Sequence, residues 1–381
     1  MNAKRHLLVI DPTAYAGGSK IATRNILNLL NKDDIRITIL ASEKHSWDSP
    51  EFNYINLFQF NWLAKKDQGI AFFLRHIVIV INILLIRFRT GKIDIALGAS
   101  GPGVDLAIYL TKRLFNYKTI QLIHGPVACS RTIGRCLKIA DEVHYLKSSE
   151  NTLLSSLSRV TETKHNIIPD NFYVMNNGLP EHLWPSECNY KKPVLFWAAS
   201  LLKWKGIDTL INAIQSITPQ LRPETHICYI KPKATSLPVS NAPIEIENVY
   251  WYETPGNLDE LRSCANIFVS TSQNEPFGLS ILESMAAGHC VLIPEDGSYW
   301  DNILEDNISC IKYLPGDATD LAYKLTTLSN DIDRIKSLGL AARKIASSYR
   351  SETQYAKIKD TLENRSTITP NNQSAHTKVS S

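Results

Sequence analysis

The segment of this 381-residue chain with the most chemical content runs from residue 274 to residue 288, where Glu275 and Glu283 stand eight residues apart. The Pro-Phe-Gly that follows Glu275 predicts a sharp turn, and its glycine lets the backbone approach a ligand closely. Residues 279–287 are good helix formers, and Gly288 predicts the end of that helix. A helix that begins at a glycine loop presents free N–H groups and a positive dipole end, which suits nucleotide phosphates. The two carboxylates can accept hydrogen bonds from sugar or ribose hydroxyls.

This segment resembles the Glu-x7-Glu motif of retaining glycosyltransferases with the GT-B fold, the large family 4 group. The resemblance implies that Glu275 binds the transferred sugar and that Glu283 binds the nucleotide ribose. It also implies that backbone amides of Phe277, Gly278 and Leu279 hold the sugar and the diphosphate. The alternative is that two surface carboxylates stand on an ordinary amphipathic helix.

A second segment, residues 201–208, resembles the family's Arg-Leu-…-Lys-Gly-Val-Asp stretch, in which an arginine and a lysine hold the leaving diphosphate. Lys205 falls on the family's lysine, but Ser200 stands where the family has its arginine. We expect Lys203, or Lys20 of the first half, to replace the missing cation. Without a replacement, diphosphate stabilisation is weaker and activity is in doubt. The alternative is that Lys205 is a solvated loop lysine.

The first half of the chain contributes two further candidates for the site. Gly17 and Gly18 lie between a predicted strand and a predicted helix, where open α/β sheets bind ligands. They resemble the family's glycine loop over the donor phosphate, although any turn can use two glycines. His124 ends a predicted strand, and the family has a histidine here that touches the donor sugar. The alternative for His124 is a structural role.

Two further matches to the family are weaker. Asn176-Asn177-Gly178 resembles the Asn-Gly segment at the end of the first domain, and we interpret it as a turn signal. Asp301 stands where the family has a glutamate beside the nucleotide, and a functional and a structural role are equally open.

Strand and helix signals alternate along most of the chain. Predicted strands at 7–10, 35–40, 93–97, 119–123 and 142–146, with a last one at 166–168 or 173–175, predict a parallel sheet covered by helices on both faces. The pattern restarts with strands at 193–198, 226–230, 249–252, 267–270 and 289–293. We therefore expect two doubly wound Rossmann-like domains facing a central cleft, as in GT-B proteins.

The domain boundaries follow from this alternation. We predict an acceptor-side domain at residues 1–182 and a nucleotide-sugar-binding domain at 190–345, joined by a linker within 181–192. The resemblance implies that a helix within 346–364 packs back on the first domain. Residues 365–381 are polar and predict a disordered tail.

Composition limits the classes of partner. The chain has no metal-ligand motif, no basic run and no nucleic-acid motif. We therefore expect no metal. We also expect no cofactor, because the nucleotide-sugar is a substrate. The seven cysteines form no CxxC pair and predict reduced thiols, and no secretory signal precedes the first strand. Together these features predict a cytoplasmic protein.

A membrane contact remains open. Residues 1–190 hold 22 Lys and Arg against 16 Asp and Glu, a net charge of +6, whereas the remainder has a net charge of −2. This basic half suits anionic lipid or an anionic acceptor, but an uneven solvated surface explains it equally well. Residues 71–88 are strongly apolar, but only 11 uncharged residues separate Arg75 from Arg87, too few to span a bilayer. A core helix is favoured over one lying in the cytoplasmic face of a membrane.

The sequence therefore predicts a retaining hexosyl-type glycosyltransferase that moves a sugar from a UDP- or GDP-sugar to a saccharide or lipid-linked acceptor. Cell-surface polysaccharide or glycolipid synthesis is the expected setting. The alternatives are a GT-B sugar-nucleotide epimerase or phosphorylase, and a non-catalytic GT-B-like subunit that binds a partner glycosyltransferase. The sugar, the base, the acceptor and linkage, and the oligomeric state leave no signature in the sequence.

Overall fold

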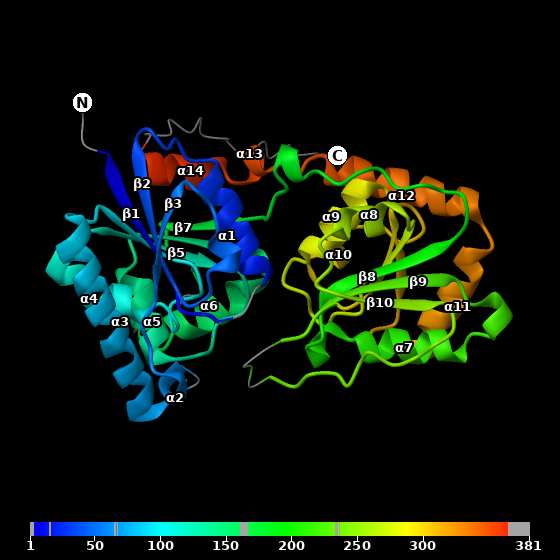
Figure 1. Ribbon diagram of the computed structural model, residues 1–381, viewed down its shortest axis with the longest axis horizontal. Helices are drawn as coiled ribbons and strands as arrows, with labels where there is room; N and C mark the ends of the chain where they lie inside the picture. Colours follow the sequence, from blue (N-terminus) through cyan, green and yellow to red (C-terminus); the bar gives the residue numbers. More distant parts are fainter. Residues whose placement is uncertain are drawn as a thin grey trace, which may run out of the picture.

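The computed structural model describes residues 4–14, 17–64, 66, 68–160, 167–232, 235 and 237–364. These residues form two α/β domains that lie side by side, with the C-terminal segment returning to the first domain (Figure 1). The predicted arrangement of two doubly wound domains is confirmed. The predicted tail at 365–381 lies outside the described residues.

The first domain is built on a seven-stranded parallel sheet of order β3-β2-β1-β4-β5-β6-β7. Its strands are nearly continuous runs of apolar residues, as expected when both faces of a parallel sheet are covered. They are β1 (Arg5–Asp11), β2 (Ile35–Ala41), β3 (Phe52–Asn56), β4 (Ile95–Gly98), β5 (Lys118–Ile123), β6 (Glu142–Leu146) and β7 (Phe172–Met175).

Six helices belong to this domain by sequence: α1 (Gly18–Asn28), α2 (Asn61–Ala64), α3 (Gly69–Thr90), α4 (Leu106–Phe115), α5 (Arg131–Ile139) and α6 (Glu150–Leu157). Alternate residues of β1 point to opposite faces of the sheet. Leu7 and Val9 pack in the cluster that contains α1, whereas Leu8 and Ile10 pack with α3 to α6. The sheet is thus covered on both faces.

The second domain has a six-stranded parallel sheet of order β10-β9-β8-β11-β12-β13. Its strands are β8 (Val194–Ser200), β9 (Glu224–Ile230), β10 (Val249–Glu253), β11 (Ile267–Val269), β12 (Cys290–Pro294) and β13 (Ile311–Tyr313). Its helices are α7 (Ile207–Ser216), α8 (Leu258–Ser263), α9 (Leu279–Ala287), α10 (Tyr299–Ile303), α11 (Ala318–Ser329) and α12 (Ile332–Ala346).

The short elements escaped the sequence analysis. β3 and β13 add an edge strand to each sheet, and α2 and α10 are helices of four and five residues. The returning helix predicted within 346–364 is divided into α13 (Ser351–Gln354) and α14 (Ala356–Glu363) by Tyr355, which is fully buried.

The last helix lies against the first sheet. Arg5 donates a hydrogen bond to the Leu362 carbonyl at 3.0 Å, and Thr361 donates to Glu142 at 2.8 Å. The Tyr355 hydroxyl accepts from the Gly178 N–H at 3.1 Å. The Asn-Gly turn at the end of the first domain is therefore fixed by the returning chain.

The apolar helix α3 is buried on one side only. Ile79, Ile83 and Ile86 join the core beneath it, but only 28% of the most apolar 18-residue stretch of α3 is buried. The prediction of a core helix is therefore wrong for its outer face. Among the described residues, α3 is the one helix long and apolar enough to cross a membrane.

Candidate functional site

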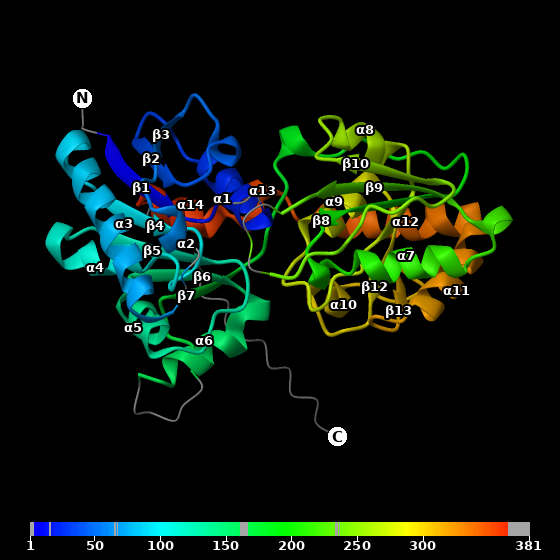
Figure 2. The ribbon, with the colours of Figure 1, turned by 60° about the horizontal axis from the view of Figure 1, so that its bottom comes forward.

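The candidate residues gather where the two domains face each other. α1 of the first domain and α9 of the second lie on the facing sides in both views (Figures 1 and 2). A methyl group built on Gly18 would lie 3.5 Å from Cδ1 of Leu279, and one built on Gly125 would lie 3.7 Å from Cγ of Pro276. The first-domain glycine loop and the His124-Gly125 turn therefore border the Glu-x7-Glu segment.

The start of α9 is shaped by its glycine. Gly278 has a φ of +82°, a left-handed conformation that strains any other residue, and a Cβ there would lie 2.8 Å from Ile281. No side chain caps this helix start, so its first N–H groups are left for a ligand. Phe277 turns its ring into a cluster with Tyr299 and Trp300. Only its backbone can then take part in binding, as the resemblance implied.

Lys205 and Glu275 form an ion pair, with 2.5 Å between Nζ and Oε2. Their side chains are only 18% and 12% exposed. The ammonium of Lys205 also lies 4.0 Å from the centre of the Trp204 ring. The cation expected to hold the diphosphate and the carboxylate expected to bind the sugar are thus in contact.

This contact is imposed by the packing of two loops. The Thr271 hydroxyl donates to the Lys205 carbonyl at 2.8 Å, and the Gln273 N–H donates to the Trp204 carbonyl at 2.9 Å. Gly206 has a φ of +71°, and a Cβ there would lie 2.0 Å from the Thr271 carbonyl oxygen. The Lys-Gly pair of the sequence therefore brings the lysine next to the loop that carries the glutamate.

Glu283 has a partner that the sequence analysis missed. Arg262 of α8 donates to Glu283 at 2.8 Å, and its other nitrogen contacts Asp259 at 2.9 Å. Arg262 is almost completely buried, whereas Glu283 is about a quarter exposed. Because 21 residues separate the two, only the fold could have revealed the pair. The arginine orients the carboxylate at one oxygen and leaves the other able to accept from a hydroxyl.

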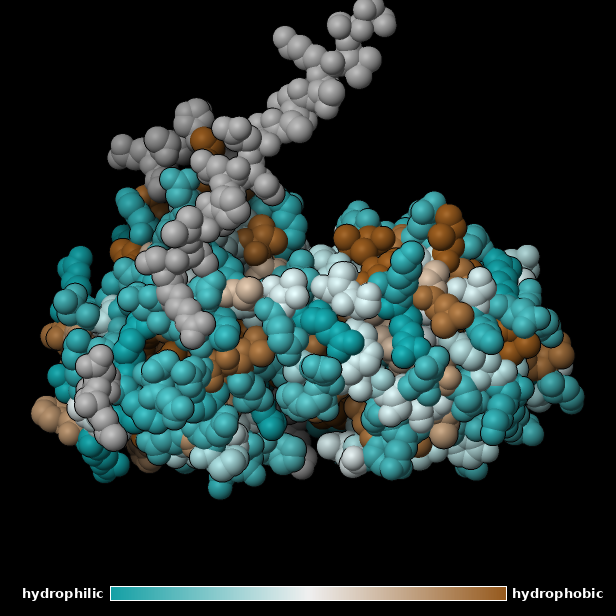
Figure 3. All heavy atoms as spheres, turned by 90° about the horizontal axis from the view of Figure 1, so that it is seen from above, coloured by the Kyte–Doolittle hydropathy of each residue, from teal (hydrophilic) through white to brown (hydrophobic). Residues whose placement is uncertain are grey.

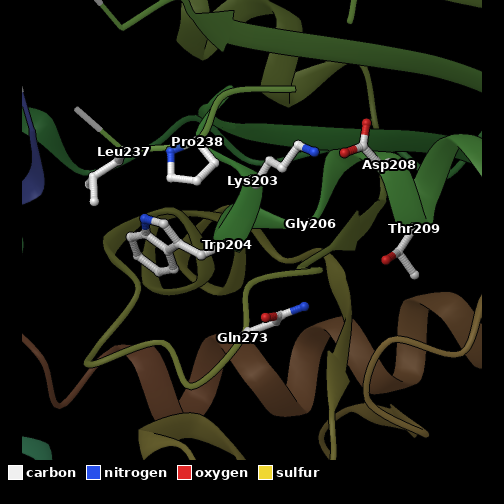
Figure 4. Close-up of a pocket in the computed structure, with 8 residues that line it drawn as sticks. All are labelled: Lys203, Trp204, Gly206, Asp208, Thr209, Leu237, Pro238 and Gln273. Carbon is white, nitrogen blue, oxygen red and sulfur yellow. The ribbon is translucent and has the colours of Figure 1, made fainter. Parts of the chain in front are cut away.

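The two candidates for the missing arginine lie in different settings. Lys20 is buried and is engaged by Asp11 at 2.9 Å and Glu43 at 3.6 Å. Lys203 is exposed and lines an open groove of about 500 Å³ in the second domain. Its ammonium is directed toward Asp208 (Figure 4). The expected role of Lys20 conflicts with its two carboxylate partners, and Lys203 is directed toward a carboxylate as well, so the replacement of the missing arginine stays a prediction.

His124 is neutral at physiological pH. Burial lowers its pKa to about 4. Its Nε2 lies 3.2 Å from the Thr23 hydroxyl, and its buried Nδ1 has no hydrogen-bond partner among the described residues. A neutral imidazole of this kind can exchange hydrogen bonds with a hydroxyl but cannot supply a positive charge.

Asp301 is used within the second domain. Its carboxylate accepts from the Gly297 N–H at 2.7 Å and contacts Lys312 at 2.7 Å. It is 8% exposed. These two contacts favour the structural role of the two left open, and the choice stays a prediction. The described residues also hold no group of three or more His, Cys, Asp or Glu that could bind a metal.

Comparisons with known proteins bear on this arrangement. Residues 180–345 match the family described as glycosyl transferases group 1. The matched stretch is 166 of the 381 residues and includes α9, the Glu-x7-Glu segment and Lys205.

Two curated relatives match about half of the chain. A sulfoquinovosyl transferase of Arabidopsis thaliana is 26% identical over 189 residues, which cover 49% of this chain and 34% of the relative. An alpha-maltose-1-phosphate synthase of Mycolicibacterium smegmatis is 23% identical over 202 residues, which cover 46% of this chain and 52% of the relative. The matched residues thus span about a third and about half of these relatives.

Nearly the whole chain resembles solved structures in its fold. HepE of Anabaena in complex with UDP-glucose superposes with a TM-score of 0.71 at 15% identity, covering 94% of this chain and 99% of that one. At this identity the likeness establishes the fold. The two domains form a GT-B fold.

Proposed function

We propose that this protein is a retaining glycosyltransferase that transfers a hexose from a nucleotide-sugar to a saccharide or lipid-linked acceptor. The observation that carries the proposal is the contact between Lys205 and Glu275 beside the uncapped start of α9, with Gly18 and Gly125 of the first domain against it. A cation, free backbone amides and a carboxylate that can accept hydrogen bonds from hydroxyls therefore lie together between the two domains. Cell-surface polysaccharide or glycolipid synthesis is the proposed setting.

The proposed chemistry is a displacement at the sugar carbon that bears the diphosphate. As that bond breaks, negative charge grows on the leaving phosphate while the sugar takes on oxocarbenium character. Lys205 and the amides at the start of α9 stabilise the charge on the phosphate. Such stabilisation is strongest when preorganised donors act in a site of low dielectric constant. Both are fixed by packing before the donor binds, so little reorganisation is needed at the moment of reaction.

The remaining residues bind and orient the substrates. Glu275 accepts from hydroxyls of the transferred sugar, and the free oxygen of Glu283 accepts from the ribose. His124 exchanges hydrogen bonds with a sugar hydroxyl in its neutral form. We assign no covalent nucleophile, because Glu275 is engaged by Lys205. The acceptor hydroxyl then attacks on the face from which the diphosphate leaves.

A donor screen followed by a product assay tests the proposal. UDP- and GDP-sugars are first ranked by the rise in melting temperature that they cause, with UDP-glucose first because HepE was solved with it. Nucleotide release is then measured with oligosaccharide and lipid-linked acceptors, and proton NMR of the product gives its anomeric configuration. The proposal predicts nucleotide release that depends on acceptor and a product with the donor's configuration. Inversion would contradict the retaining mechanism.

A non-catalytic role is the second candidate, favoured by Ser200 at the arginine position and by the engagement of Lys20. Such a subunit would bind a nucleotide-sugar or none, and would release no nucleotide with any donor and acceptor. An epimerase would convert the donor sugar without needing an acceptor. The same assay therefore separates the three functions.

A further inference from the structure

The outer face of α3 carries an uninterrupted apolar stripe. Its members recur with the helical period from Ile70 to Phe88, over about 27 Å, and their exposed fractions lie between 43% and 86%. They are Ile70, Phe73, Leu74, Ile77, Ile81, Leu85 and Phe88. A helix on the surface of a soluble protein normally turns polar residues outward, so this face requires a reason.

Neighbouring segments widen the stripe. Asn82 of α3 holds the chain at Phe58 with two hydrogen bonds, donating to its carbonyl at 3.0 Å and accepting from its N–H at 3.2 Å. The rings of Phe58 and Phe60 then meet edge to face, 5.3 Å apart. Trp62 on α2 is also exposed, as are Leu110 and Leu114 on α4, which packs beside α3. We call the following residues the α3 apolar face: Phe58, Phe60, Trp62, Ile70, Phe73, Leu74, Ile77, Ile81, Leu85, Phe88, Leu110 and Leu114.

This face differs from the side of the molecule that Figure 3 shows. On the face shown in Figure 3, hydrophobic residues lie in small separate groups among hydrophilic ones. Figure 2 shows α3 on the outside of the first domain beside α4, where neither domain covers it. A continuous apolar surface of this extent indicates a partner.

The charges around the face indicate what the partner is. Among the described residues of the stretch 58–92, Lys66, Arg89 and Lys92 are exposed, whereas Arg75 is buried. Arg87 and Arg89 stand in the last turn of α3, and Arg36 bonds to the Thr90 carbonyl at 2.6 Å. An apolar helix face with a basic margin and aromatic residues matches an anionic bilayer surface. A second copy of the chain would bring the same basic margins together.

The helix cannot cross the bilayer while the domain is folded. Ile79, Ile83 and Ile86 pack on the sheet along the opposite side, so α3 can only lie parallel to a membrane surface. α3 connects β3 to β4 within a parallel sheet, and it therefore begins at the carboxyl-end edge of that sheet. The same edge carries Gly18 and His124.

We propose that the α3 apolar face docks this protein on a bilayer that contains anionic lipids, with α3 in the plane of the headgroups. The first domain then sits on the membrane, and the amino-terminal end of α3 brings the acceptor side of the site to the lipid surface. The part of this inference that concerns a lipid-linked acceptor rests on the proposed function. The docking itself does not depend on catalysis.

Flotation with vesicles tests the docking. The purified full chain is mixed with vesicles of phosphatidylcholine and phosphatidylglycerol, or of phosphatidylcholine alone, and the bound fraction gives a partition coefficient. We expect binding to the anionic vesicles that weakens with salt. The double variant Ile77→Ser/Ile81→Ser should lower the coefficient roughly tenfold or more, because two half-exposed isoleucines no longer enter the bilayer. Arg89→Glu should lower it on anionic vesicles.

A matched control is the double variant Ile308→Ser/Leu314→Ser in the second domain, where both side chains are exposed to a similar degree. It should bind vesicles like the wild type. Circular dichroism and donor binding in solution show that each variant is folded and that the donor site is intact. A wild type that does not float with anionic vesicles, or an α3 variant that floats as well as the control, overturns the proposal.

Light scattering without lipid tests the other occupant. If Ile77→Ser/Ile81→Ser converts a dimer to a monomer and vesicles are not bound, the face joins two copies and the membrane proposal is wrong. A failure of flotation with normal nucleotide release would refute only the docking. Normal flotation without nucleotide release would refute only the proposed function.

Discussion

The pair formed by Lys205 and Glu275 makes a prediction that separates structural from chemical roles. Both side chains are more than four-fifths shielded from solvent, so removing one partner leaves a largely buried charge. Breaking such a pair costs about 3–5 kcal/mol, and the remaining exposure places Lys205→Ala near 3 kcal/mol. Glu275→Gln should cost less, because the Trp204 ring still faces the ammonium, an interaction of about 0.5–2 kcal/mol.

The double variant Lys205→Ala/Glu275→Gln removes both charges and should unfold in urea within about 1 kcal/mol of the wild type. Its kcat should not recover. If Lys205 stabilises the leaving phosphate, the double variant should turn over about 10²-fold more slowly than Glu275→Gln alone, the scale of one preorganised donor. Steady-state nucleotide release gives this ratio. Equal kcat values for the double variant and Glu275→Gln would mean that Lys205 acts only by holding Glu275, and the reasoning would be refuted.

Three further outcomes follow from the structure. Glu283→Ala should weaken nucleotide binding by about 1.5–3 kcal/mol in calorimetry. Asp259→Ala, which removes the other partner of Arg262, should change nucleotide binding little. Equal losses of nucleotide affinity in the two variants would refute the ribose assignment. Turnover should persist in excess EDTA, and its loss and rescue by Mg²⁺ would contradict charge stabilisation by Lys205. Burial lowers the pKa of His76 and His124 to about 4 and that of His289 to about 3. As the pH falls below about 6.5, these three imidazoles therefore take up protons in the unfolded chain before they do so in the folded one. The free energy of unfolding should then fall between pH 6.5 and 4, by on the order of 3 kcal/mol for each imidazole. Urea midpoints that stay constant over that range would show that these histidines are not buried in the neutral form.

The sequence predicted the elements whose signals are long and regular. The buried strands β1, β2 and β8 are nearly continuous apolar runs, and α9 begins after Gly278 and ends at Gly288. The edge strands β3 and β13 were missed because their apolar runs are short and broken by polar residues.

Within the site, the sequence predicted the types of group but not their partners. Lys205 and Glu275 were assigned to different parts of the substrate, and their direct contact depends on how Gly206 packs on Thr271. The partner of Glu283 was invisible, because Arg262 comes from a helix 21 residues earlier. Long-range pairs of this kind follow from the packing of α8 on α9, which no local pattern encodes.

The outer face of α3 shows a different limit. Its apolar composition is evident in the sequence, and a core position was the natural interpretation of a helix without a polar face. Only the structure shows that one side faces the sheet and that the other has nothing on it among the described residues.

The most direct test of the account is nucleotide release from the donor that raises the melting temperature most, measured for the wild type and Glu275→Gln in excess EDTA. The account predicts release by the wild type that rises with acceptor concentration. It predicts slower but measurable release by the variant, and calorimetry should still show nucleotide binding. A wild type that binds the donor but releases no nucleotide with any saccharide or lipid-linked acceptor would contradict the central claim and favour a non-catalytic subunit.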